Sequence, residues 1–155
     1  MLGGVVMNLL GRRRVLLTKL FAEQALENAE PVNILATTEV ELNIQEDTSI
    51  YPTKPIVQGK SYKLSFDYEY TITENTATSF QQAFRVGSYA TFQNAQIVYK
   101  GANAGVTGTF NGSYETELIA TANRTVEQSV LSIESTTTIL VGTYKLTNIS
   151  LMEVI

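Results

Sequence analysis

The feature that most constrains this chain is a strict two-residue alternation that begins at residue 62. Polar or charged residues separate apolar or aromatic side chains at every second position, namely Tyr62, Leu64, Phe66, Tyr68, Tyr70 and Ile72. A period of two is that of a β-strand with one buried face and one solvated face. The stretch therefore predicts a long strand whose apolar face packs onto a second sheet.

Residues 32–154 have the composition of a β domain, because Val, Ile, Thr, Tyr and Phe are frequent and turn residues separate the runs. Asn111-Gly112 and Gly142 are among the turn signals. No helical segment lies between the runs, which favours an antiparallel sandwich or barrel. The pattern predicts strands over 32–36, 38–45, 48–51, 60–73, 79–87, 95–100, 105–120, 127–134, 136–141 and 143–154.

The C-terminal run 143–154 is the other stretch of comparable length and is the expected neighbour of 60–73. Its apolar positions shift by one after Leu146, because Ile149 rather than Asn148 continues the pattern. A β-bulge produces such a shift by inserting one extra residue. We therefore expect a bulge at this point of the C-terminal strand.

Composition narrows the chemistry that the chain can perform. The 155 residues suit one domain, and 44% hydrophobic residues exclude a disordered chain. A formal net charge of -4 argues against nucleic acid as a partner. The chain has neither Cys nor His, so it lacks disulfides, zinc–thiolate sites and any catalytic set built on those residues. These features predict a protein that is not an enzyme.

Residues 1–31 differ from the rest, because Leu, Ala, Arg and Glu dominate there. We expect an amphipathic helix from about residue 5 to 28, ended by Pro31. Three interpretations stay open: a helix packed on its own domain, an arm docked on another subunit, and a cleaved presequence or interfacial membrane helix. No apolar run approaches the roughly 18 residues of a transmembrane helix. The expected anchoring or subunit-contact residues are Leu9, Leu10, Arg12, Arg13, Arg14, Leu16, Leu17, Leu20 and Phe21.

Carboxylates two residues apart on a strand share one face, which places them about 7 Å apart. Such pairs can run acid–base chemistry, but they are also the ordinary pattern of a solvated sheet face, and we favour that interpretation. No cofactor is expected, although Glu46 and Asp47 leave a structural calcium ion open. The pairs are Asp67 with Glu69, Glu115 with Glu117, and Glu39 with Glu41.

Three stretches together resemble the jelly-roll modules of the carbohydrate-binding type. They are GKSYKLSF at 59–66, TGTF at 107–110 and LTNISL at 146–151. Such modules occur in glycan-active enzymes and in tail, baseplate and capsid-fibre proteins of bacteriophages. The resemblance covers residues 32–154 and rests on core and turn residues. It implies a mainly β, antiparallel sandwich of the jelly-roll type behind an N-terminal helical arm (1–31).

The chain departs from glycan-binding members of that family, which usually present Trp or Tyr platforms that stack on sugars. It has no Trp, and several of its eight Tyr belong to the apolar face of 60–73. The remaining candidates for glycan contact are Tyr89, Tyr99 and Tyr114, for which a core or rim role is the competing interpretation.

The two-part chain and the resemblance lead to a functional hypothesis. The chain is expected to be a non-enzymatic virion structural protein of a bacteriophage, in which the arm docks on the particle and the sandwich is exposed. Its expected partners are other virion proteins and further copies of itself, in a homo-oligomer. The alternative is a carbohydrate-binding module that recognises host-surface or environmental glycan.

Overall fold

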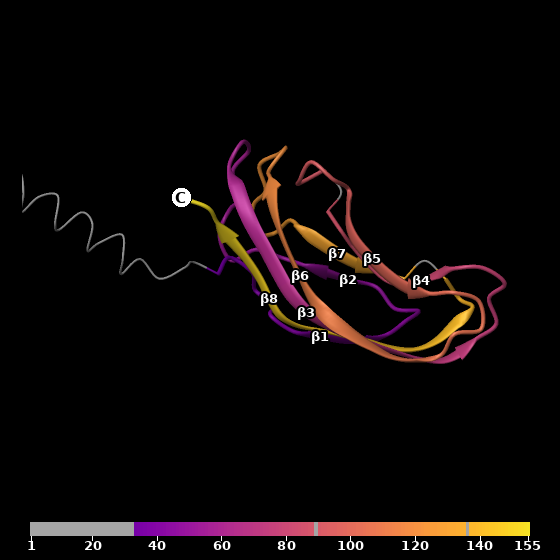
Figure 1. Cartoon of the computed structure of the whole chain (residues 1–155). Coiled ribbons are helices and arrows are strands. Elements are labelled where there is room, and N and C mark those ends of the chain that lie inside the picture. The colour runs from indigo at the N-terminus through magenta and orange to yellow at the C-terminus, as the bar shows by residue number, and fades with distance from the viewer. Residues whose placement is uncertain (1–32, 89, 136) are drawn as a thin grey trace, which may run out of the picture. The chain divides into compact units, whose positions relative to one another are not determined.

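Two four-stranded antiparallel sheets face each other across one core (Figure 1). The computed structural model describes residues 33–88, 90–135 and 137–155. The first sheet has the order β1-β8-β3-β6, and the second has the order β2-β7-β4-β5. The strands are β1 Val40–Asn43, β2 Thr48–Ile50, β3 Ser61–Asn75, β4 Gln81–Gly87, β5 Gln96–Ala102, β6 Gly108–Ile119, β7 Leu131–Glu134 and β8 Leu140–Glu153.

These strands confirm the predicted mainly β, antiparallel sandwich. Consecutive strands alternate between the sheets, except that β4 and β5 form a pair within the second sheet. The predicted N-terminal helix lies outside the described residues. The chain divides into the units Met1–Pro31 and Val32–Ile155, and the sandwich belongs to the second.

The alternating stretch forms β3, which lies between β6 and β8 in the first sheet. Its predicted apolar face points into the core, where Tyr62, Leu64, Phe66, Tyr70 and Ile72 are buried. Tyr68, on the same face, is only half-buried. Burial of an aromatic side chain stabilises the fold by about 2–3 kcal/mol, so this single face supplies a large share of the core energy.

Tyrosine hydroxyls inside the sandwich bond to backbone groups of the other sheet and of the loops. The hydroxyls of Tyr70 and Tyr114 donate to the carbonyls of Gly101 (3.1 Å) and Ile97 (3.2 Å) on β5. The Tyr144 hydroxyl donates to the carbonyl of Glu46 at 3.1 Å. A buried hydroxyl needs such a partner, and here each partner also joins two parts of the sandwich.

The predicted bulge in the C-terminal strand is confirmed. The register between β3 and β8 pairs Ser65 with Ser150 and then Asp67 with Thr147, so two residues of β8 lie opposite Phe66. Asn148, the first of the two, has a φ of 54°, a left-handed conformation that Asn tolerates better than most residues. The bulge keeps buried side chains on the inner face on both sides of it.

Four strand predictions were wrong in extent. Residues 33–36 make only isolated bridges, through Asn33 and Leu35, instead of a strand. The strand predicted over 127–134 begins at Leu131. The runs 136–141 and 143–154 are parts of one strand, β8, that begins at Leu140 and passes through the predicted turn residue Gly142.

Gly142 remains in the strand because the sheet leaves no room there for a side chain. A Cβ atom at this position would lie 1.9 Å from the carbonyl oxygen of Thr71, and its φ of +155° is one that L residues rarely adopt. Glycine here therefore permits a close approach between β8 and β3, which is a common use of glycine inside strands.

Phe66→Ala should destabilise the protein far more than Glu69→Ala. The Phe66 ring is 3% exposed and stacks on Tyr114 with a centroid distance of 5.3 Å. Its loss should lower the free energy of unfolding by about 3–5 kcal/mol, whereas loss of the exposed Glu69 side chain should change it by about 0.5 kcal/mol or less. Urea unfolding of both variants measures the difference. Equal effects would contradict the assignment of the inner face.

Candidate functional site

The outer face of the first sheet carries a polar hollow of about 520 Å3. It lies where β3, β6 and β8 run side by side, on the face that the sequence predicted to be solvated. Small polar and charged side chains dominate its lining, so it suits water or a hydrogen-bonding ligand better than an apolar one. The lining residues are Asp67, Tyr68, Glu69, Asn111, Gly112, Ser113, Lys145 and Thr147.

Asp67 is held in the hollow by two hydrogen bonds. Its two carboxylate oxygens accept hydrogen bonds from the Ser113 hydroxyl (2.5 Å) and from the Asn148 amide (2.7 Å). These bonds, the one from Ser113 first, lower the pKa of Asp67 below its usual value. Asn148 is the bulge residue of β8, so the backbone irregularity also delivers a donor to the outer face. A carboxyl kept ionised in this way accepts hydrogen bonds and does not act as a general acid.

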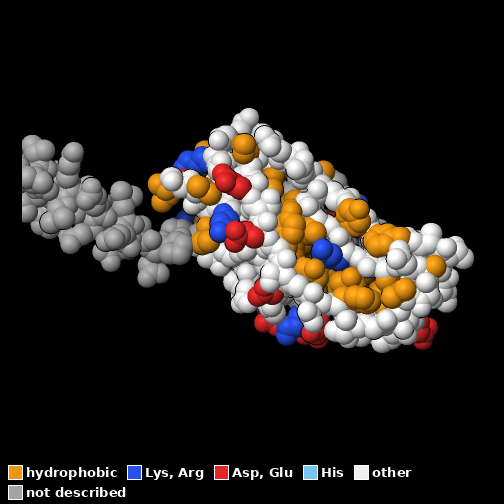
Figure 2. Space-filling model, viewed as in Figure 1, with side chains coloured by type: hydrophobic (Ala, Val, Ile, Leu, Met, Phe, Trp, Pro, Cys, Tyr) orange, Lys and Arg blue, Asp and Glu red, His pale blue; other side chains and the backbone are white. Residues whose placement is uncertain are grey.

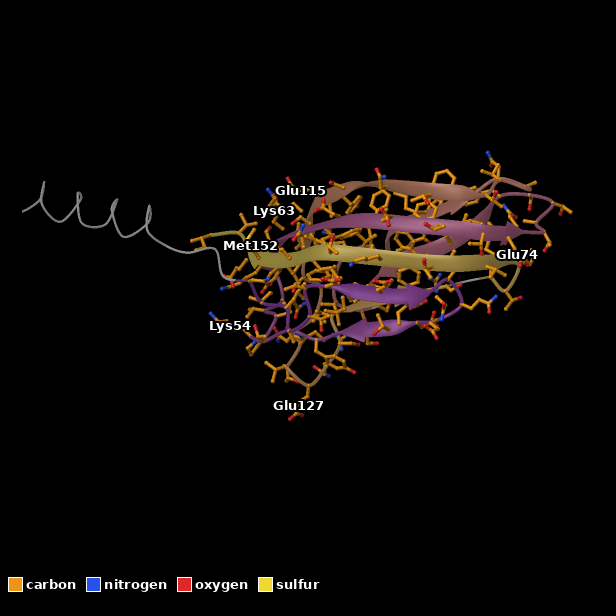
Figure 3. All side chains as sticks on the ribbon, turned by 90° about the horizontal axis from the view of Figure 1, so that it is seen from below. Lys54, Lys63, Glu74, Glu115, Glu127 and Met152 are labelled. Atoms are coloured by element: carbon orange, nitrogen blue, oxygen red, sulfur yellow. The ribbon has the colours of Figure 1, made fainter. Side chains whose placement is uncertain are left out.

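Glu39, Glu41 and Glu115 form ion pairs with lysines of this face. Lys145 on β8 lies 2.8 Å from Glu39 and 3.6 Å from Glu41, and its hydrogen bond to Glu39 raises the pKa of Lys145. Lys63 on β3 lies 2.9 Å from Glu115 on β6, and Figure 3 shows the two side by side. These contacts match the expected solvated sheet face, in which carboxylates pair with lysines across strands.

Glu46 and Asp47, which the sequence offers as ligands of a structural calcium ion, hold loops together. A Glu46 carboxylate oxygen accepts a hydrogen bond from the backbone of Asn43 at 3.1 Å. Asp47 accepts one from the backbone of Ser135 at 2.7 Å. Within the described residues, no three acidic side chains gather in a way that could hold a metal ion.

The tyrosines expected at a glycan site lie in different environments. Tyr99 is 49% exposed on β5, and its ring meets Phe80, itself 45% exposed, edge to face at 6.1 Å. Tyr114 is half-buried, because its ring stacks on Phe66 and its hydroxyl is bonded to β5. Tyr89 lies outside the described residues. The structure thus brings Tyr99 together with Phe80 rather than with Tyr114.

The anchoring residues expected between Leu9 and Phe21 also lie outside the described residues. Among the residues that are described, no helix has the length and apolar character needed to cross a membrane.

Two parts of this surface were missed by sequence reasoning. Phe80 was placed in a predicted strand without a role, and only the fold brings it to Tyr99. Ser113 and Lys145 could have been associated with Asp67 and Glu69 only through strand register, which pairs Ser113 with Asp67 and Lys145 with Glu69. One signal of this polar surface was present in the sequence, which was the predicted bulge at Asn148, next to Thr147.

No protein-family model matches the sequence, and no curated protein is similar to it in sequence. Among solved structures, the N-terminal cellulose-binding domain of Cellulomonas fimi β-1,4-glucanase C has a TM-score of 0.44 and 9% identity, over 78% of this chain and 83% of that one. A CBM4 structure has a TM-score of 0.35 and 12% identity, over 80% of each chain. The Drosophila NLP-core has a TM-score of 0.40 and 11% identity, over 75% of this chain and 99% of that one. Likenesses this weak carry no functional inference.

Replacing Asp67 with Asn should make the protein less stable at neutral pH and nearly as stable as wild type in acid. A carboxyl whose folded pKa is lowered contributes stability above its unfolded pKa of about 3.9 and loses it as the pH falls through the folded value. Urea unfolding at pH 7 and near pH 2 measures the gap between wild type and Asp67→Asn. Ser49→Ala, at an exposed serine of β2, is the control and should show no such gap. A gap that persists unchanged in acid would contradict the role of the two hydrogen bonds.

Proposed function

We propose that this chain is a non-enzymatic virion structural protein of a bacteriophage, in which residues 1–31 dock on the particle and the sandwich is displayed. The observation that carries the proposal is that the described residues form one continuous core cluster between the two sheets. The buried cluster runs from Ile34 to Leu151. The sequence of residues 1–31 is basic and amphipathic, and its apolar stripe suits docking on a neighbouring protein.

We infer further that the sandwich is a jelly roll, the fold class expected for such a virion module. Its strands pair as β1 with β8, β2 with β7, β3 with β6 and β4 with β5. These nested pairs are what results when one long antiparallel ribbon of four strands against four is rolled into two sheets. A rolled ribbon leaves the loops at both ends of the sandwich free for contacts with a ligand or a partner.

Removing residues 1–31 should leave a folded domain that no longer joins the particle. We expect the truncated chain to keep the β-sheet circular dichroism and cooperative unfolding of the full chain, since the core stays intact. Incorporation is measured by supplying tagged full-length or truncated protein during infection by the phage that encodes the chain, and probing purified particles. A folded, truncated protein that still incorporates at the full-length level would refute the docking role.

A second candidate function is glycan recognition, and the exposed aromatic pair of Phe80 and Tyr99 favours it. Two aromatic rings at this exposure offer apolar faces on which the C–H face of a sugar can stack. The amide side chain of Gln81, at the start of β4 next to Phe80, is a further hydrogen-bonding group beside the pair.

Tyr99→Ala and Phe80→Ala should each weaken glycan binding about tenfold, because each removes one stacking ring. The control is Tyr51→Ala, which removes a tyrosine of similar exposure (44%) away from the pair. A glycan array of the full chain identifies a ligand, and calorimetric titration compares the variants. An array without binding, or equal affinities for Tyr99→Ala and Tyr51→Ala, would exclude this candidate.

A further inference from the structure

Sheet edges are the parts of this sandwich on which unpaired backbone groups are concentrated. An edge strand presents a row of free N–H and C=O groups, and natural proteins protect such edges by making them short, bulged or charged. The described part of the chain has four edge strands, which are β1, β6, β2 and β5. They differ sharply in how well they are protected.

Three of the edges carry a protective device. Strand β1 has only four residues and β2 only three. Strand β5 has seven residues, with two register irregularities against β4. On β5, the Lys100 ammonium group lies over the ring of Tyr68, 5.1 Å from its centroid, and the carbonyls of Ile97 and Gly101 accept tyrosine hydroxyls. An inward-pointing lysine and a bulge are recognised ways to block edge pairing.

Strand β6 is neither short nor bulged, and its only charged residues are Glu115 and Glu117. It has twelve residues, and its register against β3 runs without a shift from Ser61–Ile119 to Ile72–Gly108. Its sequence GTFNGSYETELI contains no Lys, Arg or Pro. Its inner-facing rings, Phe110 and Tyr114, are only half-buried. Figure 2 shows hydrophobic side chains gathered along the side of the sandwich where β5 and β6 lie. The long, regular edge and the partly exposed rings occur at the same place.

We propose that β6 pairs antiparallel with β6 of a second copy of this chain, which joins two first sheets into one continuous sheet across a twofold axis at Ser113. In that register each residue lies opposite the residue of the second copy that is equally far from position 113 on the other side. Glu115 then lies opposite Asn111 of the partner, and Glu117 lies opposite Thr109. Moving the axis two residues toward the C-terminus would place Glu115 opposite itself, which opposes pairing.

The sizes of the facing side chains and the point at which the free edge of β6 ends favour the same axis. Tyr114 lies opposite Gly112 of the second copy, and Phe110 lies opposite Thr116, so each ring meets a small neighbour. The pairing also ends before Ile119, whose carbonyl already accepts a hydrogen bond from the backbone of Gln93 at 3.2 Å. The interface is isologous, as expected for a C2 dimer. It does not depend on the virion or glycan proposals, because it uses only the edge of the first sheet.

The charge of residue 109 tests the register. Thr109 is exposed, and its neighbour within the chain is the uncharged Thr71, whose hydroxyl lies 2.8 Å away. Thr109→Lys and Thr109→Glu lose that contact equally but place opposite charges against Glu117 of the second copy. The dimer dissociation constant should be about tenfold lower for the Lys variant than for the Glu variant, because the twofold axis creates two such pairs. High salt should reduce the difference.

Sedimentation equilibrium of the full-length variants measures the dissociation constants.

The absence of cysteine allows a second test by disulfide trapping. Ser113→Cys should oxidise to a covalent dimer, because it faces itself across the axis. Ser49→Cys, at an exposed serine of the β2 edge, should not. A full chain that stays monomeric, charge variants with equal dissociation constants, or equal cross-linking at positions 113 and 49 would each overturn the proposal.

Discussion

The structure depends on β3, the fifteen-residue strand that lies between β6 and β8. Its inner face contributes five buried side chains to the core, and its rings meet those of the facing sheet, as Tyr70 meets Phe84 at 5.6 Å. Both flanking strands must be long because they pair with this strand along its length. The length of β6, and with it the exposed edge, is thus a consequence of the length of β3.

The outer face of the same sheet is determined by an irregularity rather than by the regular ladder. The bulge at Asn148 turns the Asn148 side chain to the surface, where it meets Asp67 together with Ser113. The bulge therefore has two effects: it keeps the core side chains of β8 on the inner face, and it places a hydrogen-bond donor at Asp67 in the polar hollow. Bulges are frequent next to binding sites for this reason, because they redirect a side chain without breaking the sheet.

The features of this sandwich that are available for recognition lie on its surface. The interior is filled by side chains and bonded tyrosine hydroxyls, and no buried side-chain polar atom of the described residues lacks a hydrogen-bond partner. The features that remain for recognition are the aromatic pair of Phe80 and Tyr99, the outer hollow and the β6 edge. All three lie at the surface of the sandwich, where a ligand or a partner can reach them.

The sequence by itself determined the sandwich, the long alternating strand, its pairing with the C-terminal strand and the bulge, because a two-residue period is a local signal. It misjudged Gly142 and Asn111-Gly112, which read as turns. Both continue as strand because of distant contacts: Gly142 lies against the Thr71 backbone, and a Cβ at Gly112 would lie 2.6 Å from the Tyr68 hydroxyl. The site was less predictable still. Only the tertiary structure decided that Phe80 meets Tyr99 and that β6 is an edge, since strand order depends on contacts between residues far apart in the chain.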